Sequence, residues 1–150
     1  MHKEKEAEAL FKKEKKRLIK KFGRVALTNI QIDKFCDKEL GDKYKGSYAV
    51  DDSYERKIGM MIINTDTKNG SGIHWISLYS TPNTVYYYDS FSRSPKSLTP
   101  KLVKKFKNKK IIRVDPSDKE QLDPENICGH LSISFLLCVK KLGIRKAKLI

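Results

Sequence analysis

Residues 121–137 read QLDPENICGHLSISFLL, and the rest of the chain can be interpreted around them. A polar loop with Pro124 and Asn126 leads to Cys128, and a long apolar run over 131–139 follows. This pattern predicts a buried helix with Cys128 in its first turn. The free N–H groups and the dipole of a helix N-terminus, together with a cationic neighbour, lower a thiol pKa from about 8.5 to about 3.5–7.5. Cys128 is therefore a candidate nucleophile, although a lone cysteine beside an apolar helix more often serves packing.

Length and composition predict one globular domain over residues 1–150. No apolar run approaches the roughly 20 residues of a membrane span, and the start of the chain, MHKEKE, lacks the apolar core of a secretory signal. We therefore expect a non-secreted, intracellular protein that does not contact membranes. Cys36, Cys128 and Cys138 have no Cys-x-x-Cys spacing, which argues against a disulfide framework and a zinc site. No metal or organic cofactor is indicated.

The net charge of +14 is concentrated in segments. Residues 1–23 contain nine Lys or Arg and four Glu, and residues 96–113 contain eight basic residues and no acidic one. Residues 139–150 add five more basic residues. Such clusters attract polyanions, of which nucleic acid is the commonest in a cell. A solvated basic surface that only maintains solubility explains them equally well, because no RNA-binding signature accompanies them.

Periodicity and turn signals predict the other elements along the chain: a basic helix over 3–22 that ends at Gly23, a short helix between Thr28 or Asn29 and Gly41, strands over 58–64, 74–79 and 84–89, a basic helix from Pro100 to about Lys107, and a strand over 110–114. Residues 42–56 are interpreted as irregular. The sequence does not decide whether the first helix packs on the domain. The predicted fold class is α+β, with a central, mostly antiparallel sheet packed against the buried helix that carries Cys128.

Two further residues complete a plausible thiol site. His74 begins one predicted strand and Asp89 ends the next, and those two ends are neighbours in an antiparallel hairpin. The imidazole would accept the thiol proton, and the carboxylate would orient the imidazole and support its charge. Gln121, seven residues before Cys128, could donate a hydrogen bond to an oxyanion beside the N–H of Cys128. His130 should point away from Cys128, because two residues turn a helix by about 200°.

The motifs GIHW at 72–75, YDSF at 88–91 and Gln121 spaced seven residues before Cys128-Gly129 resemble those of the adenain and Ulp-type cysteine proteases. This group includes the adenovirus maturation protease, relatives in other large DNA viruses and virophages, and the cellular SUMO-deconjugating enzymes. The order His, Asp or Glu, Gln, Cys is typical of that clan. The resemblance covers residues 27–143, and the short chain is similar to the compact viral members.

The resemblance implies a role for each site residue. Cys128 would be the nucleophile, His74 the general base, Asp89 the orienting acid and Gln121 the oxyanion donor. Trp75 and Gly129 would contact the substrate. An indole wall leaves little room for Cβ atoms, so the resemblance implies cleavage after Gly-Gly or Gly-X-Gly sites. Tyr48 is a candidate for the opposite wall of that channel.

The function expected from the resemblance is a monomeric cysteine endopeptidase that processes viral precursor proteins during virion maturation. It would work in the host cytoplasm or nucleus and in the virion, with DNA or a peptide as a possible activator. A second interpretation keeps the chemistry and makes the substrate a conjugate of a ubiquitin-like modifier. A third, non-enzymatic interpretation is a basic nucleic-acid-binding protein with Cys128 in its core.

Overall fold

The fold is built on a five-stranded sheet. The computed structural model describes residues 2–65, 74–90, 100–114 and 126–150, with side chains from residue 6 onward. The strands lie in the order β1 (Tyr44–Ala49), β2 (Gly59–Asn64), β3 (Trp75–Ser80), β4 (Thr84–Tyr88) and β5 (Lys110–Val114). The two central pairs, β2 with β3 and β3 with β4, are antiparallel, as the meander predicts. Both edge pairs are parallel, so the sheet is mixed and the prediction of a mostly antiparallel sheet is wrong.

Strand β1 is the element that the sequence pattern concealed. It lies in the segment 42–56, for which the sequence predicts irregular structure. Gly46 has a φ of 110°, and the pairing register with β2 shifts between Tyr44 and Ser47. A bulge of this kind interrupts the alternation by which a strand is recognised. The strand is tied to the preceding helix, because the Tyr44 hydroxyl donates to Asp33 Oδ1 at 2.6 Å.

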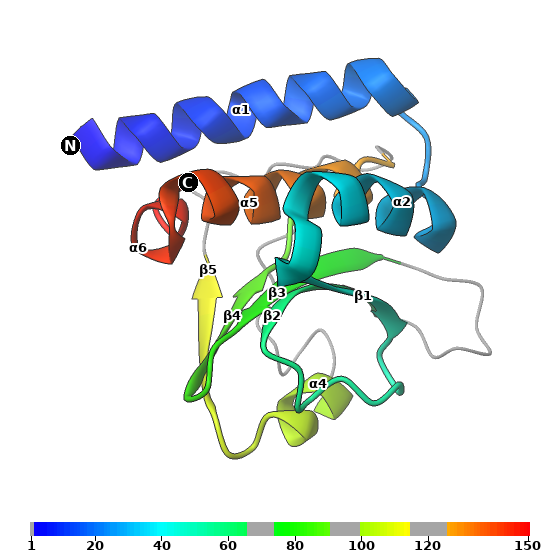
Figure 1. Cartoon of the computed structure of the whole chain (residues 1–150), viewed down its shortest axis with the longest axis vertical. Helices are drawn as coiled ribbons and strands as arrows, with labels where there is room; N and C mark the ends of the chain where they lie inside the picture. Colours follow the sequence, from blue (N-terminus) through cyan, green and yellow to red (C-terminus); the bar gives the residue numbers. More distant parts are fainter. Residues whose placement is uncertain (1, 66–73, 91–99, 115–125) are drawn as a thin grey trace.

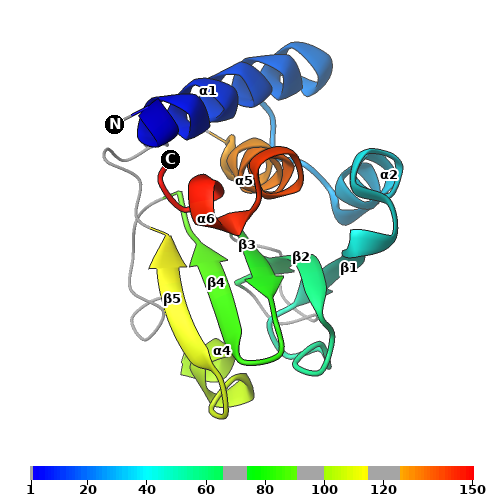
Figure 2. The ribbon, with the colours of Figure 1, turned by 60° about the vertical axis from the view of Figure 1, so that its left-hand side comes forward.

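Helix α5 (Cys128–Leu142) is the buried helix that the apolar run predicts. Every residue from Gly129 to Val139 is buried. One side of α5 packs on β2 and β3, and the other sides contact α1 (His2–Phe22), α2 (Asn29–Leu40) and the short α6 (Ile144–Ala147). Figure 1 and Figure 2 show α5 lying between the sheet and α1. The nucleophile candidate therefore begins a helix enclosed on most sides.

Helix α1 packs on the domain, which answers the question that the sequence left open. Its Ala7, Phe11 and Leu18 are fully covered and belong to the same apolar cluster as α5. Phe11 meets the ring of Tyr88 on the sheet at a centroid distance of 5.8 Å. Glu14, also buried, is satisfied at 2.8 Å by Arg17 of the same helix and at 3.4 Å by Lys141 of α5. Without α1, the outer side of α5 would be exposed to water.

The opposite face of the sheet carries a second apolar cluster under α4 (Pro100–Lys105). Leu102 of α4 and Phe106 pack there on Ile63 and Ile76 of the central strands. Figure 1 shows α4 on the side of the sheet away from α5. The two clusters thus place the basic helix α4 far from the helix that begins with Cys128.

Several local predictions are confirmed. Thr28 is the N-cap of α2 and forms a capping box with Gln31, and Gly41 follows the last residue of that helix. Gly23 follows α1 with a φ of 79°, a conformation that favours glycine. Cys36 and Cys138 are buried free thiols, which fits a packing role for both.

Among the helices of the described residues, none combines the length and apolarity required to cross a membrane.

Candidate active site

Cys128 is the first residue of α5, at the place where the helix meets the start of β3. Its side chain is only partly covered, unlike those of the other two cysteines. The Trp75 backbone N–H donates to Cys128 Sγ at 3.4 Å, and the Gly129 N–H also contributes a hydrogen bond to the sulfur. Both donors and the N-terminal end of the helix dipole favour a negative sulfur.

His74 and Asp89 meet at the adjoining strand ends, as hairpin geometry predicts. His74 Nε2 and Asp89 Oδ1 are 2.6 Å apart, and both side chains are buried. A carboxylate only accepts hydrogen bonds, so Nε2 carries the ring proton and donates a hydrogen bond to Asp89 Oδ1. The imidazole also hydrogen-bonds the Cys128 side chain, which leaves Nδ1 as the nitrogen for the thiol proton. Cys128, His74 and Asp89 therefore form one connected chain of hydrogen bonds.

The electrostatics of the three groups favour an ion pair. Burial by itself raises the pKa of the Cys128 thiol, but the hydrogen bonds from His74 and from the Trp75 and Gly129 amides bring it below its usual value. Burial lowers the pKa of His74, but its contacts with Asp89 and Cys128 outweigh burial and raise it. A lowered thiol pKa beside a raised imidazole pKa favours transfer of the thiol proton to the imidazole.

Trp75 is held from two sides. Its indole Nε1 donates to the Leu27 carbonyl at 2.9 Å, and its own carbonyl accepts from Ser132 Oγ at 3.0 Å. Leu27 precedes α2, and Ser132 lies one turn after Cys128 on α5. These bonds fix both the side chain and the backbone of the residue whose N–H reaches the sulfur. The indole is partly covered and lies on the α5 side of the sheet.

Gly129 is buried against Leu27, and a Cβ built on it would lie 3.2 Å from Leu27 Cδ1. A larger residue after Cys128 would therefore require Leu27 to shift by a few tenths of an ångström. The structure thus assigns Gly129 a packing role and an N–H donor role, and its contact with substrate stays a prediction.

Tyr48 is not the second wall of a channel over Trp75, so that prediction is wrong. Its ring stacks on Tyr54 at a centroid distance of 5.6 Å and belongs to the cluster on the α4 side of the sheet. Tyr48 pairs with Ile63, and Ile63 with Ile76, so all three side chains lie on one face. Trp75, next to Ile76 along β3, faces the other side.

His130 is turned away from the sulfur, as the helix geometry predicts. Its Nε2–H donates to the Gly23 carbonyl at 2.7 Å, and its ring meets Phe22 edge-on. Burial, followed by the nearby charge of Arg24, holds the pKa of His130 below its usual value. His130 is therefore a structural histidine of α5 that binds the backbone just after α1.

Gln121 lies outside the described residues, as do Gly72, Ile73 and Phe91 of the quoted motifs. The part of the site that sequence reasoning missed consists of Leu27 and Ser132. Ser132 carried a signal, since a serine inside a buried apolar helix must find a hydrogen-bond partner. Leu27 acts through its carbonyl, and no side-chain pattern reports such a role.

Within the part of the chain that the structure describes, no group of three or more His, Cys, Asp or Glu side chains is arranged to hold a metal ion. In comparisons with known proteins, no family model matches the chain, and no curated protein sequence matches it significantly. The function is therefore inferred from the geometry of the residues themselves.

Proposed function

We propose that this protein is a cysteine endopeptidase of the adenain and Ulp type, with Cys128 as nucleophile, His74 as base and Asp89 as the group that orients His74. The observation that carries the proposal is the hydrogen-bonded chain from Asp89 through His74 to Cys128 at the start of a buried helix. Three residues with separations of 15 and 39 positions in the sequence would not converge in this order for packing alone.

The geometry supports a two-step acyl transfer. The Cys128 thiolate attacks the carbonyl carbon of the scissile peptide bond, and the electrons of the C=O bond move to its oxygen. When the tetrahedral intermediate collapses, the C–N bond breaks and the His74 imidazolium gives its proton to the leaving amine. Water, deprotonated by His74, then attacks the thioester and releases the acid and the thiol. Asp89 keeps the imidazole in the required tautomer throughout.

The oxyanion would be bound by backbone N–H groups at the start of α5. The positive end of the helix dipole lies at the same position and would stabilise the negative charge. Gln121 is proposed as a second donor through the family resemblance. A preorganised donor of this kind is worth about 10²- to 10³-fold in turnover.

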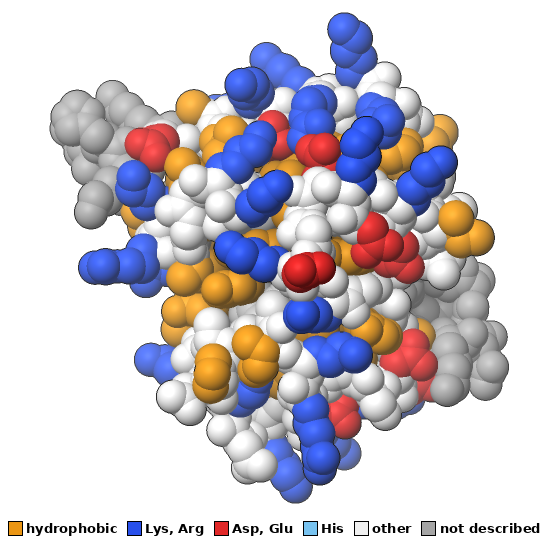
Figure 3. Space-filling view, viewed as in Figure 1, with side chains coloured by type: hydrophobic (Ala, Val, Ile, Leu, Met, Phe, Trp, Pro, Cys, Tyr) orange, Lys and Arg blue, Asp and Glu red, His pale blue; other side chains and the backbone are white. Residues whose placement is uncertain are grey.

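Trp75 supports the proposed preference for glycine before the scissile bond. Its indole is fixed by the bond to Leu27, and its backbone N–H reaches the Cys128 sulfur, so the ring is a fixed surface that belongs to the same residue as this donor. A substrate backbone that passes close to such a surface is easiest to fit without Cβ atoms. Viral precursor proteins are the proposed substrates, and conjugates of ubiquitin-like modifiers are the alternative. Figure 3 shows numerous Lys and Arg side chains over the face that contains α1 and α2, which supports DNA as an additional partner.

The test is cleavage of peptides that contain Gly-Gly or Gly-X-Gly, compared with the same peptides in which alanine replaces glycine. We expect cleavage after glycine by the wild type, and none by Cys128→Ala. Cys138→Ala is the matched control, because Cys138 lies on the same helix but is buried. Cleavage that persists in a purified Cys128→Ala preparation would refute the proposal. A ubiquitin-like fusion assayed in parallel separates the two substrate classes.

A further inference from the structure

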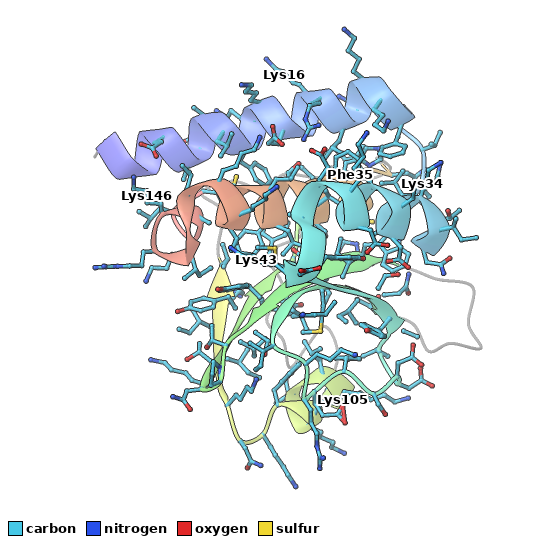
Figure 4. All side chains as sticks on the ribbon, in the orientation of Figure 1. Lys16, Lys34, Phe35, Lys43, Lys105 and Lys146 are labelled. Atoms are coloured by element: carbon cyan, nitrogen blue, oxygen red, sulfur yellow. The ribbon has the colours of Figure 1, made fainter. Side chains whose placement is uncertain are left out.

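A groove of about 410 Å³ lies between the C-terminal half of α1 and helix α2, away from the site described above. This volume falls within the range of about 300–1,000 Å³ typical of ligand pockets. Its floor contains the rings of Phe22 and Phe35, which meet edge to face at a centroid distance of 5.9 Å. Figure 4 shows Phe35 on the side of α2 that faces α1. The groove thus combines a concave shape with an apolar floor.

The rim of the groove is cationic. Four basic residues line it, namely Arg17, Lys21, Lys34 and Lys38, against a single carboxylate, Glu39. Arg17 is already neutralised, because it binds Glu14 and Glu39 at 2.8 Å each. The three lysines are exposed, and none of them forms an ion pair with a carboxylate of the described residues.

Lys34 and Lys38 stand one helical turn apart on α2. Like charges at this spacing repel and destabilise a helix slightly. A bound anion between them would relieve that repulsion, and its attraction would extend to Lys21 across the groove. The arrangement therefore favours a negatively charged ligand that also carries apolar surface.

From these features we infer that the groove binds an acidic peptide segment with an aromatic or large apolar side chain. The acidic side chains would pair with Lys21, Lys34 and Lys38, and the apolar side chain would pack on the partly exposed ring of Phe22. A nucleic acid fits less well. Single-stranded bases bind by stacking on exposed ring faces, whereas Phe35 is only 7% exposed and Arg17 lies over its ring at 5.4 Å.

The groove is connected to the candidate active site through residues 23–28, which join α1 to α2. At one end of this linker, Gly23 accepts a hydrogen bond from His130. At the other end, Leu27 accepts the bond from the Trp75 indole. A protein whose acidic segment occupied the groove would thus contact the two helices joined by the linker that holds the Trp75 indole. In a peptidase, the groove would serve as a second docking point for substrates, and this role rests on the proposed function. Binding of an acidic segment to the groove does not depend on that function.

The experiment measures fluorescence anisotropy of labelled probes with the full-length Cys128→Ala protein, so that no turnover occurs. The main probe is a short peptide of alternating glutamate and phenylalanine. Two control peptides replace all glutamates by glutamine or all phenylalanines by glycine, and a duplex and a single-stranded oligonucleotide serve as competing polyanions. We expect the glutamate–phenylalanine peptide to bind more tightly than both control peptides.

Charge reversal locates the site. The double variant Lys34→Glu and Lys38→Glu should weaken peptide binding by about tenfold or more, since it removes two attractive charge pairs and replaces them with repulsive ones. The matched control is Lys104→Glu and Lys107→Glu, two exposed lysines at and just beyond α4, which lower the net charge equally and should change binding less than about twofold. Lys34→Gln with Lys38→Gln should show an intermediate loss without adding new charges.

Three results would overturn the inference: equal weakening by both charge-reversed variants, equal binding of all three peptides, or loss of oligonucleotide binding alone in the groove variant. The last result would assign the groove to nucleic acid. None of these results depends on cleavage, so failure of the groove and failure of the peptidase proposal can be told apart.

Discussion

Two buried histidines lie near Cys128, His74 in space and His130 along the chain. They differ in the acceptor that each ring faces. His74 shares a hydrogen bond with a carboxylate, Asp89, whereas His130 donates to a backbone carbonyl, that of Gly23. Burial lowers the pKa of both rings. At His74 the charged partners reverse that effect, and at His130 the carbonyl dipole does not.

The difference between the two rings shows that burial alone does not make a histidine a base. A full negative charge at hydrogen-bond distance stabilises the imidazolium more than desolvation destabilises it, and a neutral acceptor does not. The two rings therefore have opposite assignments: His74 titrates with the sulfur, and His130 stays neutral and holds α1 to α5.

The largest expected effect comes from making the partner of His74 neutral. Asp89→Asn should lower turnover of a glycine-containing peptide by about a thousandfold or more, because the amide neither fixes the tautomer nor supports the imidazolium. The kcat of purified variants is the measurement. Asp33→Asn is the control, since Asp33 also accepts a hydrogen bond from a side chain, that of Tyr44, but does not contact His74. Near-normal turnover in Asp89→Asn would show that the charge of Asp89 is not needed.

A smaller effect is expected from the support of Trp75. Ser132→Ala removes the hydrogen bond to the Trp75 carbonyl and should reduce kcat by about tenfold, because an unpaired polar group costs about 1–3 kcal/mol and the strand end can shift. Ser134→Ala is matched to it, since Ser134 is equally buried on α5 but donates back to His130 of the same helix. Ser132→Ala should also shift the pH profile of activity, because the Trp75 N–H that reaches the sulfur moves with the strand end, whereas Ser134→Ala should not. Identical pH profiles of the two variants would show that Ser132 has only a packing role.

The smallest effect concerns stability and tests the assignment of His130 as neutral. Its folded pKa is lowered, so the unfolded chain takes up the proton first and the native state loses stability as pH falls below about 6.5. His130→Gln should therefore reduce the free energy of unfolding that the protein loses between about pH 7 and pH 5. His74 contributes with the opposite sign, because its raised pKa gives stability that is present at low pH and lost as pH rises through that pKa. Denaturant unfolding at several pH values measures both contributions to the free energy of unfolding. If His130→Gln lost as much stability at acidic pH as the wild type, the assignment of His130 as neutral would be contradicted.

The helix that begins with Cys128 and the His74–Asp89 contact could be predicted from the sequence because their signals are local. An apolar run of helical length and two short strands around a turn are sufficient to place Cys128, His74 and Asp89 near one another. The direction of His130 followed from helix geometry for the same reason.

The other features depend on contacts between distant segments. Strand β1 was missed because Gly46 and the register shift break its alternation. The supporting roles of Leu27 and Ser132 depend on where α2 and β3 meet α5, and Tyr48 was placed on the wrong face because its strand was not recognised. The docking of α1 required knowing that α5 has a second apolar side.

The most direct test of the central claim is the pH dependence of iodoacetamide alkylation at each cysteine, read by peptide mass spectrometry in the wild type and in His74→Ala. Cys36 and Cys138 are internal controls, because burial raises the pKa of both thiols, that of Cys138 to about 12. We predict rapid labelling of Cys128 alone at about pH 6, and its loss in His74→Ala. Labelling of Cys128 that rises only near the usual thiol pKa, and is the same in both proteins, would contradict the thiolate–imidazolium pair and with it the proposed site.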